Sequence, residues 1–209
     1  AAVNARAQKL GIVPGLALAD ARALHPGLIV ADMDEAADHL WLKRLAERCT
    51  CWSPLVSIAA PSGITLDIAG SEHLFGGEAD LVAQAGKTFA GIGMAVRMAC
   101  AFTAQGAQAL ARHAPHPVED ERRALRALPV LALGLDEDAT LALRRAGLKT
   151  VGDVASRPAA GIAARFGAAA VTALRRLLGE EATPIDPLRR PEPLQFERRF
   201  AEPVVLQAM

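Results

Sequence analysis

Alternating apolar and polar residues, the pattern of a β-strand, occur only between residues 55 and 101 of this chain. Residues 55–60 and 64–68 alternate with a period of two, and Pro61-Ser62-Gly63 separates them, which is typical of a β-hairpin. A further strand is predicted at residues 94–101, where Ala99 and Ala101 are spaced like inward-facing positions. Beyond residue 119 the apolar residues follow only the helical period. The pattern therefore predicts an α+β fold, with a mixed or antiparallel sheet, helices on one face of it, and an all-helical part after it.

Helical periodicity predicts helices before, between and after the strands. Five prolines between residues 184 and 203 predict an extended linker after the last helix. The predicted helices cover residues 5–10, 18–24, 36–47, 81–88, 105–112, 121–128, 137–146, 151–155, 159–166 and 168–179.

The composition excludes several classes of protein. Of 209 residues, 52% are hydrophobic, and 23 basic side chains balance 23 acidic ones, which indicates a globular chain rather than a disordered one. No apolar run reaches about 18 residues, the length that predicts a membrane span, and no secretory leader pattern opens the sequence. Cys49, Cys51 and Cys100 lack the spacing of a zinc site and are interpreted as reduced thiols. We expect a cytoplasmic protein with no metal or cofactor.

One segment of this neutral chain is strongly basic. Between Arg144 and Arg176 seven basic residues stand against the single acid Asp153, a local net charge of +6. Such a segment is either a solvated helix face or a surface that binds phosphate.

Two helix-hairpin-helix patterns lie beside or within this segment. Gly134 precedes the predicted helix 137–146, and Gly167 precedes the predicted helix 168–179. Glycine turns of this kind expose backbone amides that bind phosphate at a helix start. Asp136, Glu137 and Asp138 follow the first turn and would compete for those amides. The candidate DNA-backbone contacts are Gly134, Arg144, Arg145, Lys149, Arg165, Gly167, Arg175 and Arg176.

Two motifs carry a resemblance to a known family. Residues 57–71, followed by Leu74-Phe75-Gly76, resemble the central palm motif of Y-family (UmuC/DinB-like) DNA polymerases, and residues 4–15 resemble their fingers motif. The resemblance extends over nearly the whole chain. It implies fingers at residues 1–35, a palm without its first strand at 36–118, a helix-hairpin-helix thumb at 119–183, and a linker at 184–209 to a little-finger domain.

The family's chemistry needs residues that this chain does not have at the matching positions. Clustered carboxylates of the family hold two divalent ions for phosphoryl transfer, and the matching Asp-Glu pair is replaced by Ser62 and Gly63. The Tyr and Arg that grip the incoming triphosphate correspond to Ala5 and Gln8. We therefore expect no polymerase activity.

These replacements make the chain most similar to the non-catalytic ImuB group of the family. The resemblance implies an adaptor in translesion synthesis and induced (SOS) mutagenesis during DNA repair. Such an adaptor binds DNA and joins the sliding clamp, a RecA-like accessory protein and an error-prone C-family polymerase.

Two alternatives remain open from the sequence. One is an active but divergent translesion polymerase with metal ligands from elsewhere, for which Asp32, Asp34 and Glu35 are the candidates, although they resemble first-turn partners of a helix dipole. The other is a helix-hairpin-helix DNA-binding module unrelated to polymerases.

Overall fold

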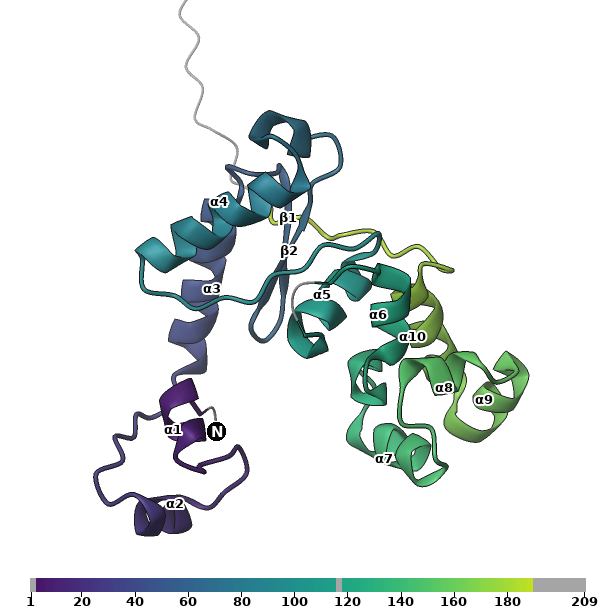
Figure 1. Cartoon of the computed structure of the whole chain (residues 1–209), viewed down its shortest axis with the longest axis horizontal. Helices are drawn as coiled ribbons and strands as arrows, with labels where there is room; N and C mark the ends of the chain where they lie inside the picture. The colour runs from purple at the N-terminus through teal and green to yellow at the C-terminus, as the bar shows by residue number, and fades with distance from the viewer. Residues whose placement is uncertain (1–2, 116–117, 190–209) are drawn as a thin grey trace, which may run out of the picture. The chain divides into compact units, whose positions relative to one another are not determined.

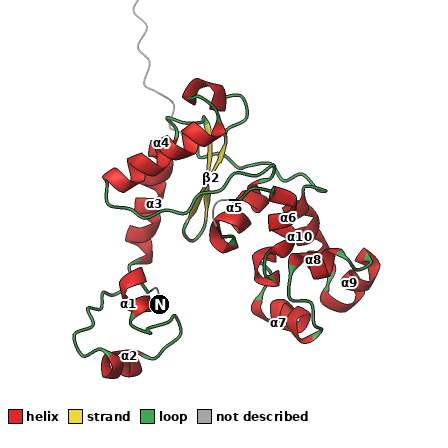
Figure 2. Cartoon of the chain, viewed as in Figure 1, coloured by secondary structure: helices red, strands yellow, loops and turns green. Residues whose placement is uncertain are grey.

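A computed structural model describes residues 3–115 and 118–189, which form two compact units that divide between Leu45 and Ala46. Helices dominate both units, and the described strands form a single hairpin (Figures 1 and 2). The predicted α+β class is confirmed. In the described part of the chain, no helix is both long and apolar enough to cross a membrane.

The first unit contains α1 (Ala5–Lys9), α2 (Leu18–Leu24) and most of α3 (Glu35–Cys49), as the sequence predicted. Side-chain caps fix two of the helix starts, since a carboxylate or amide oxygen satisfies a backbone amide that has no partner in the helix. Oδ1 of Asn4 accepts a hydrogen bond from the amide of Ala7 at 2.9 Å. Oδ1 of Asp34 accepts one from the amide of Ala37, also at 2.9 Å.

The second unit contains the predicted hairpin. Strands β1 (Leu55–Ala59) and β2 (Gly63–Asp67) pair antiparallel, with Ala59 opposite Gly63 at the turn. Successive strand residues face opposite sides, so Val56 and Thr65 are buried on different faces of the hairpin. The apolar positions Ile58, Ile64, Leu66 and Ile68 are half-buried, because a ribbon of two strands is too narrow to bury a whole face.

The strand predicted at residues 94–101 is wrong. This segment is extended, but residues 95–101 donate to no backbone partner of β1 or β2 in the described part of the chain. Alternation of apolar and polar residues predicts an extended backbone. It does not show whether another strand lies beside the segment to form hydrogen bonds with it. Most of residues 94–101 therefore lie exposed or half-exposed.

The helices of the second unit match the predicted ones within a few residues, and two have the predicted bounds. Short 3₁₀ turns, η1 (Glu72–Phe75) and η2 (Val130–Leu133), precede two of them. The helices are α4 (Glu78–Gly91), α5 (Ala104–His113), α6 (Glu121–Ala127), α7 (Glu137–Arg145), α8 (Val151–Ala155), α9 (Ala159–Phe166) and α10 (Ala168–Leu178).

Helices α5 to α10 share one hydrophobic core. Leu110 of α5, Leu143 of α7 and Val151 of α8 are completely buried in it. Full burial of one such side chain contributes about 1.5–3 kcal/mol. Because α5 also packs against β2, it joins the hairpin to the helical part.

The segment predicted as a linker contains no helix or strand over residues 184–189, where the amide of Leu188 donates to the carbonyl of Val56 at 2.6 Å. The rest of it, residues 190–209, lies outside the described residues. The boundaries expected for fingers, palm, thumb and linker stay predictions.

Candidate nucleic-acid interface

The first glycine turn has the predicted geometry but a different occupant. Gly134 has φ of +67°, a conformation that favours glycine, and it ends η2 just before α7. The carboxylate of Asp136 caps α7 and accepts a hydrogen bond from the amide of Ala139 at 2.7 Å. An acid therefore occupies the helix start where a phosphate would bind.

The second glycine turn is open. Gly167, with φ of +90°, joins α9 to α10, and no side chain caps the first amides of α10. The first turn of α10 contains no acidic residue. This helix start is compatible with an approaching phosphate, and the first one is not.

Two of the predicted contacts lie away from the first glycine turn, and a third lies in the loop before α8. Arg144 and Arg145 are exposed in the last turn of α7, at the other end of that helix from Gly134. The exposed Lys149 lies in the loop before α8, where its amide donates to Oδ2 of Asp153 at 2.9 Å. The structure therefore does not bring Arg144 and Arg145 together with Gly134, whereas the carbonyl of Lys149 accepts from the amide of Val130 at the start of η2, at 2.8 Å.

Asp153, the single acid of the basic segment, has a structural role. It forms a capping box with Thr150 at the start of α8, and the amides of Thr150 and Lys149 donate to its carboxylate at 2.8 and 2.9 Å. These hydrogen bonds lower the pKa of Asp153, so its carboxylate stays charged and continues to accept hydrogen bonds from the amides at the helix start.

Two other predicted arginines have partners. Nε of Arg176 lies 2.9 Å from Oε1 of Glu181, and exposed pairs of this kind contribute at most about 1 kcal/mol. The guanidinium of Arg165 lies 5.3 Å from the centre of the Phe166 ring, a cation–π contact. Both remain exposed, but the ion pair reduces the charge that Arg176 offers to DNA.

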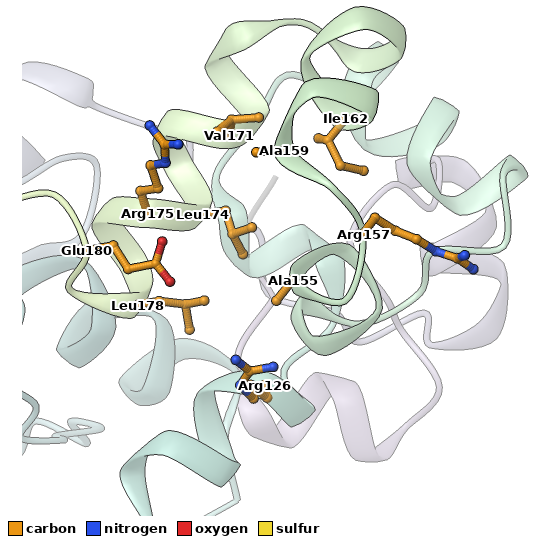
Figure 3. Close-up of a pocket in the computed structure, with 10 residues that line it drawn as sticks. All are labelled: Arg126, Ala155, Arg157, Ala159, Ile162, Val171, Leu174, Arg175, Leu178 and Glu180. Atoms are coloured by element: carbon orange, nitrogen blue, oxygen red, sulfur yellow. The ribbon is translucent and has the colours of Figure 1, made fainter.

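Arg175 lies in a group that the sequence did not reveal. It borders a hollow of about 130 Å³ together with Arg126 of α6 and Arg157 of the loop before α9. Figure 3 shows the three arginines on different sides of a floor that includes Leu174, and all three are exposed. Glu180 is the one acid of this lining, against three arginines.

This three-arginine rim (Arg126, Arg157 and Arg175) was only partly predicted from the sequence. Arg157 belonged to the basic segment but was not among the predicted contacts, and Arg126 lies outside that segment. The packing of α6 against α8 brings Arg126 to the rim. A sequence pattern within α6 cannot predict this contact, because the contact depends on a distant segment. Arginine is suited to this place, since its planar fork binds phosphate oxygens in pairs.

The hairpin turn places Ser62 and Gly63 side by side, with Ser62 exposed. A Cβ atom on Gly63 would lie 3.3 Å from Nη2 of Arg112 and 3.0 Å from the carbonyl oxygen of Ala59. An arginine of α5 therefore reaches the hairpin turn.

The other predicted positions lie in the first unit. Ala5 begins α1, and the exposed Gln8 of α1 donates from Nε2 to the carbonyl of Val3 at 3.4 Å. Asp34 caps α3, with Glu35 in the first turn of that helix, which agrees with the role suggested by their sequence position. Within residues 3–115 and 118–189, no three His, Cys, Asp or Glu side chains gather closely enough to hold a metal ion.

Comparison with known proteins identifies the chain's relatives. No family model matches the sequence. It is 42% identical over 200 residues to protein ImuB of Caulobacter vibrioides, in strains NA1000/CB15N and ATCC 19089 alike, and the match covers 93% of this chain. The chain is a homologue of ImuB. It spans 43% of the length of those relatives.

Solved structures show the fold of this ImuB homologue. DinB from Sulfolobus solfataricus superposes with a TM-score of 0.67 at 18% identity, covering 88% of this chain and 57% of that one. The insertion ternary complex of Dbh DNA polymerase superposes with a TM-score of 0.70 at 18% identity, covering 87% and 56%. The described part of the chain therefore has the fold of Y-family DNA polymerases.

Proposed function

We propose that this chain belongs to a catalytically inactive, polymerase-like adaptor that acts in the cytoplasm in translesion synthesis and induced mutagenesis. Its palm contributes a scaffold without phosphoryl-transfer chemistry, and its helical part holds DNA by the backbone. The homology to ImuB and the Y-family fold support this role. The sliding clamp, a RecA-like accessory protein and an error-prone C-family polymerase are the proposed partners.

One observation carries the proposal of inactivity. The hairpin turn has a hydroxyl and a hydrogen at Ser62 and Gly63, the positions matched to the carboxylate pair of the family, and Arg112 reaches the same turn. Divalent ions in phosphoryl transfer need anionic oxygen ligands, and a guanidinium repels them. The two metal ions that the fold family implies therefore do not fit the residues of this turn.

Primer extension tests the proposed inactivity. Purified full-length protein is incubated with a primed template and all four dNTPs in Mg²⁺ and, separately, in Mn²⁺, beside an active Y-family polymerase as positive control. We expect no incorporation in either metal. Template-directed synthesis above the background of a denatured sample would support the divergent polymerase instead.

The proposed DNA contacts are the three-arginine rim and the open turn at Gly167. An adaptor of this kind holds the phosphate backbone without base contacts, so its affinity falls steeply with salt. A DNA-binding module without a polymerase role would show the same salt dependence. Pull-down of the clamp and the error-prone polymerase by the full-length protein separates the two, because only the adaptor retains them.

A further inference from the structure

Arg112 extends from the last turn of α5 to the turn of the hairpin. Its Nη2 atom lies 3.3 Å from the place of a Cβ atom on Gly63, so the guanidinium reaches the backbone of the turn closely. Arg112 is exposed, and in the described part of the chain it forms no ion pair and donates no hydrogen bond. Its guanidinium therefore has free donors beside an open turn.

Two further basic side chains lie close to Arg112. His113 follows it, half-buried, and burial together with the charges of Arg112 and Arg97 lowers the pKa of this imidazole. Arg97 comes from the extended segment before α5, and its Nη2 donates to the carbonyl of Ala114. We call Arg97, Arg112 and His113 the tip cluster.

A purely structural role accounts for only part of the tip cluster. Cations near a helix C-terminus interact favourably with its dipole, and Arg97 bonds a carbonyl at the end of α5. Arg112 bonds none of the described carbonyls and points its terminal nitrogen to the hairpin instead. A helix dipole does not explain why this nitrogen lies at the hairpin turn.

Anions fit this place better than cations do. A planar guanidinium with free donors binds phosphate oxygens in pairs, and a hydroxyl such as that of Ser62 donates to a phosphate oxygen as well. Arg97 adds positive charge nearby, although it has one hydrogen bond of its own. Such a site supplies from the protein the positive charge that a metal ion would otherwise bring.

We propose that the hairpin turn and Arg112 form a binding site for a phosphate group that needs no metal ion. This inference rests on the proposed inactive palm and gives that palm a ligand. The phosphate comes from a free nucleotide or from a nucleic acid, which share this chemistry.

The test uses tripolyphosphate and dATP as probes, titrated into the full chain in EDTA and followed by isothermal calorimetry. Phosphorus NMR line broadening provides an independent readout. We expect binding without divalent metal, and about tenfold weaker binding by R112Q, since this variant cannot form the charge-assisted hydrogen bond to the phosphate. The matched control is R48Q, because Arg48 is also exposed in the last turn of a helix, α3.

A second variant keeps the test independent of Arg112 itself. Ser62 is exposed at the turn, so S62E adds a negative charge without filling a packed space, and it should weaken binding of both probes. Equal affinity of wild type, R112Q and S62E overturns the proposal, as does binding that appears only with Mg²⁺. Urea unfolding of each variant verifies that the fold is intact.

Competition identifies the source of the phosphate. A 5′-phosphorylated single-stranded oligonucleotide that displaces dATP in an Arg112-dependent way indicates nucleic acid, and failure to displace it indicates a free nucleotide. Primer extension remains a separate measurement. A chain that polymerises refutes the inactive palm, whereas the absence of R112Q-sensitive binding in an inactive chain refutes only the phosphate site.

Discussion

Gln108 and Thr65 join α5 to the hairpin through one side-chain hydrogen bond, in which Nε2 of Gln108 donates to Oγ1 of Thr65 at 2.8 Å. Thr65 is only 6% exposed, so water cannot readily replace this donor. A buried polar group without its partner costs more than the bond itself contributes. The bond therefore fixes how α5, which carries Arg112, lies against the turn that contains Gly63.

We expect Thr65→Val to lower the free energy of unfolding by about 1–2 kcal/mol, since the β-branched shape is kept while the acceptor is removed. Urea denaturation measures this change. The double variant T65V/Q108L should be destabilised by less than the sum of the two single variants, because it leaves neither group without a partner. Additive effects would show that the two side chains do not stabilise each other.

Asp136 offers a test of whether the first glycine turn meets DNA. Asn caps helices as well as Asp does, so Asp136→Asn should change stability by only a few tenths of a kcal/mol. If DNA approaches α7, removal of this charge should tighten binding several-fold in fluorescence anisotropy at low salt. Asp120→Asn is the matched control, because Asp120 caps α6 through the same contact, from the amide of Arg123. Equal affinities of the two variants would place DNA elsewhere.

The three cysteines should differ in reactivity. Burial raises the pKa of Cys49 to about 11, with a smaller contribution from Cys51, and burial together with the charge of Glu78 raises that of Cys100 to about 11. A raised pKa keeps the thiol protonated at neutral pH, and the thiolate is the reactive form. The exposed Cys51 should therefore be the one that a thiol reagent labels quickly in the native protein.

Mass spectrometry after brief iodoacetamide treatment at pH 8 checks this order. Cys51→Ser should remove the fast phase, and urea should make the remaining thiols accessible. Rapid labelling of Cys49 in native C51S would contradict the burial that the structure gives it.

Local elements could be predicted from the sequence, whereas contacts between distant segments could not. Helices α8 and α9 have their predicted bounds, and a capping box of Thr150 and Asp153 fixes the start of α8 locally. The segment 94–101 was wrongly predicted as a strand because alternation says nothing of a partner. The approach of Arg112 to Gly63 depends on how α5 packs against β2, and hydrophobic periodicity in the sequence does not predict that packing.

The same limit separates the predicted from the observed basic surface. Charge counting found Arg175 but grouped it with Arg144 and Arg145, which lie in the last turn of another helix. The structure groups Arg175 with Arg126 and Arg157 instead. Charge density along the sequence therefore included Arg157 and Arg175 in the basic segment but not Arg126, which lies outside it.

The three-arginine rim predicts a measurable salt dependence of DNA binding. Removing one phosphate-binding cation should reduce the slope of log affinity against log salt by about 1, so the variant R126Q/R157Q/R175Q should bind duplex DNA more weakly and with a slope flatter by about 2–3. Fluorescence anisotropy from about 50 to 200 mM salt measures both effects. The control variant R144Q/R145Q/K149Q removes the same number of positive charges from the surface that the sequence favoured. Comparing the two variants distinguishes a specific role of the rim from a dependence on net charge alone. If the second triple variant flattens the slope as much as the first, binding follows total charge and the rim has no special place in it.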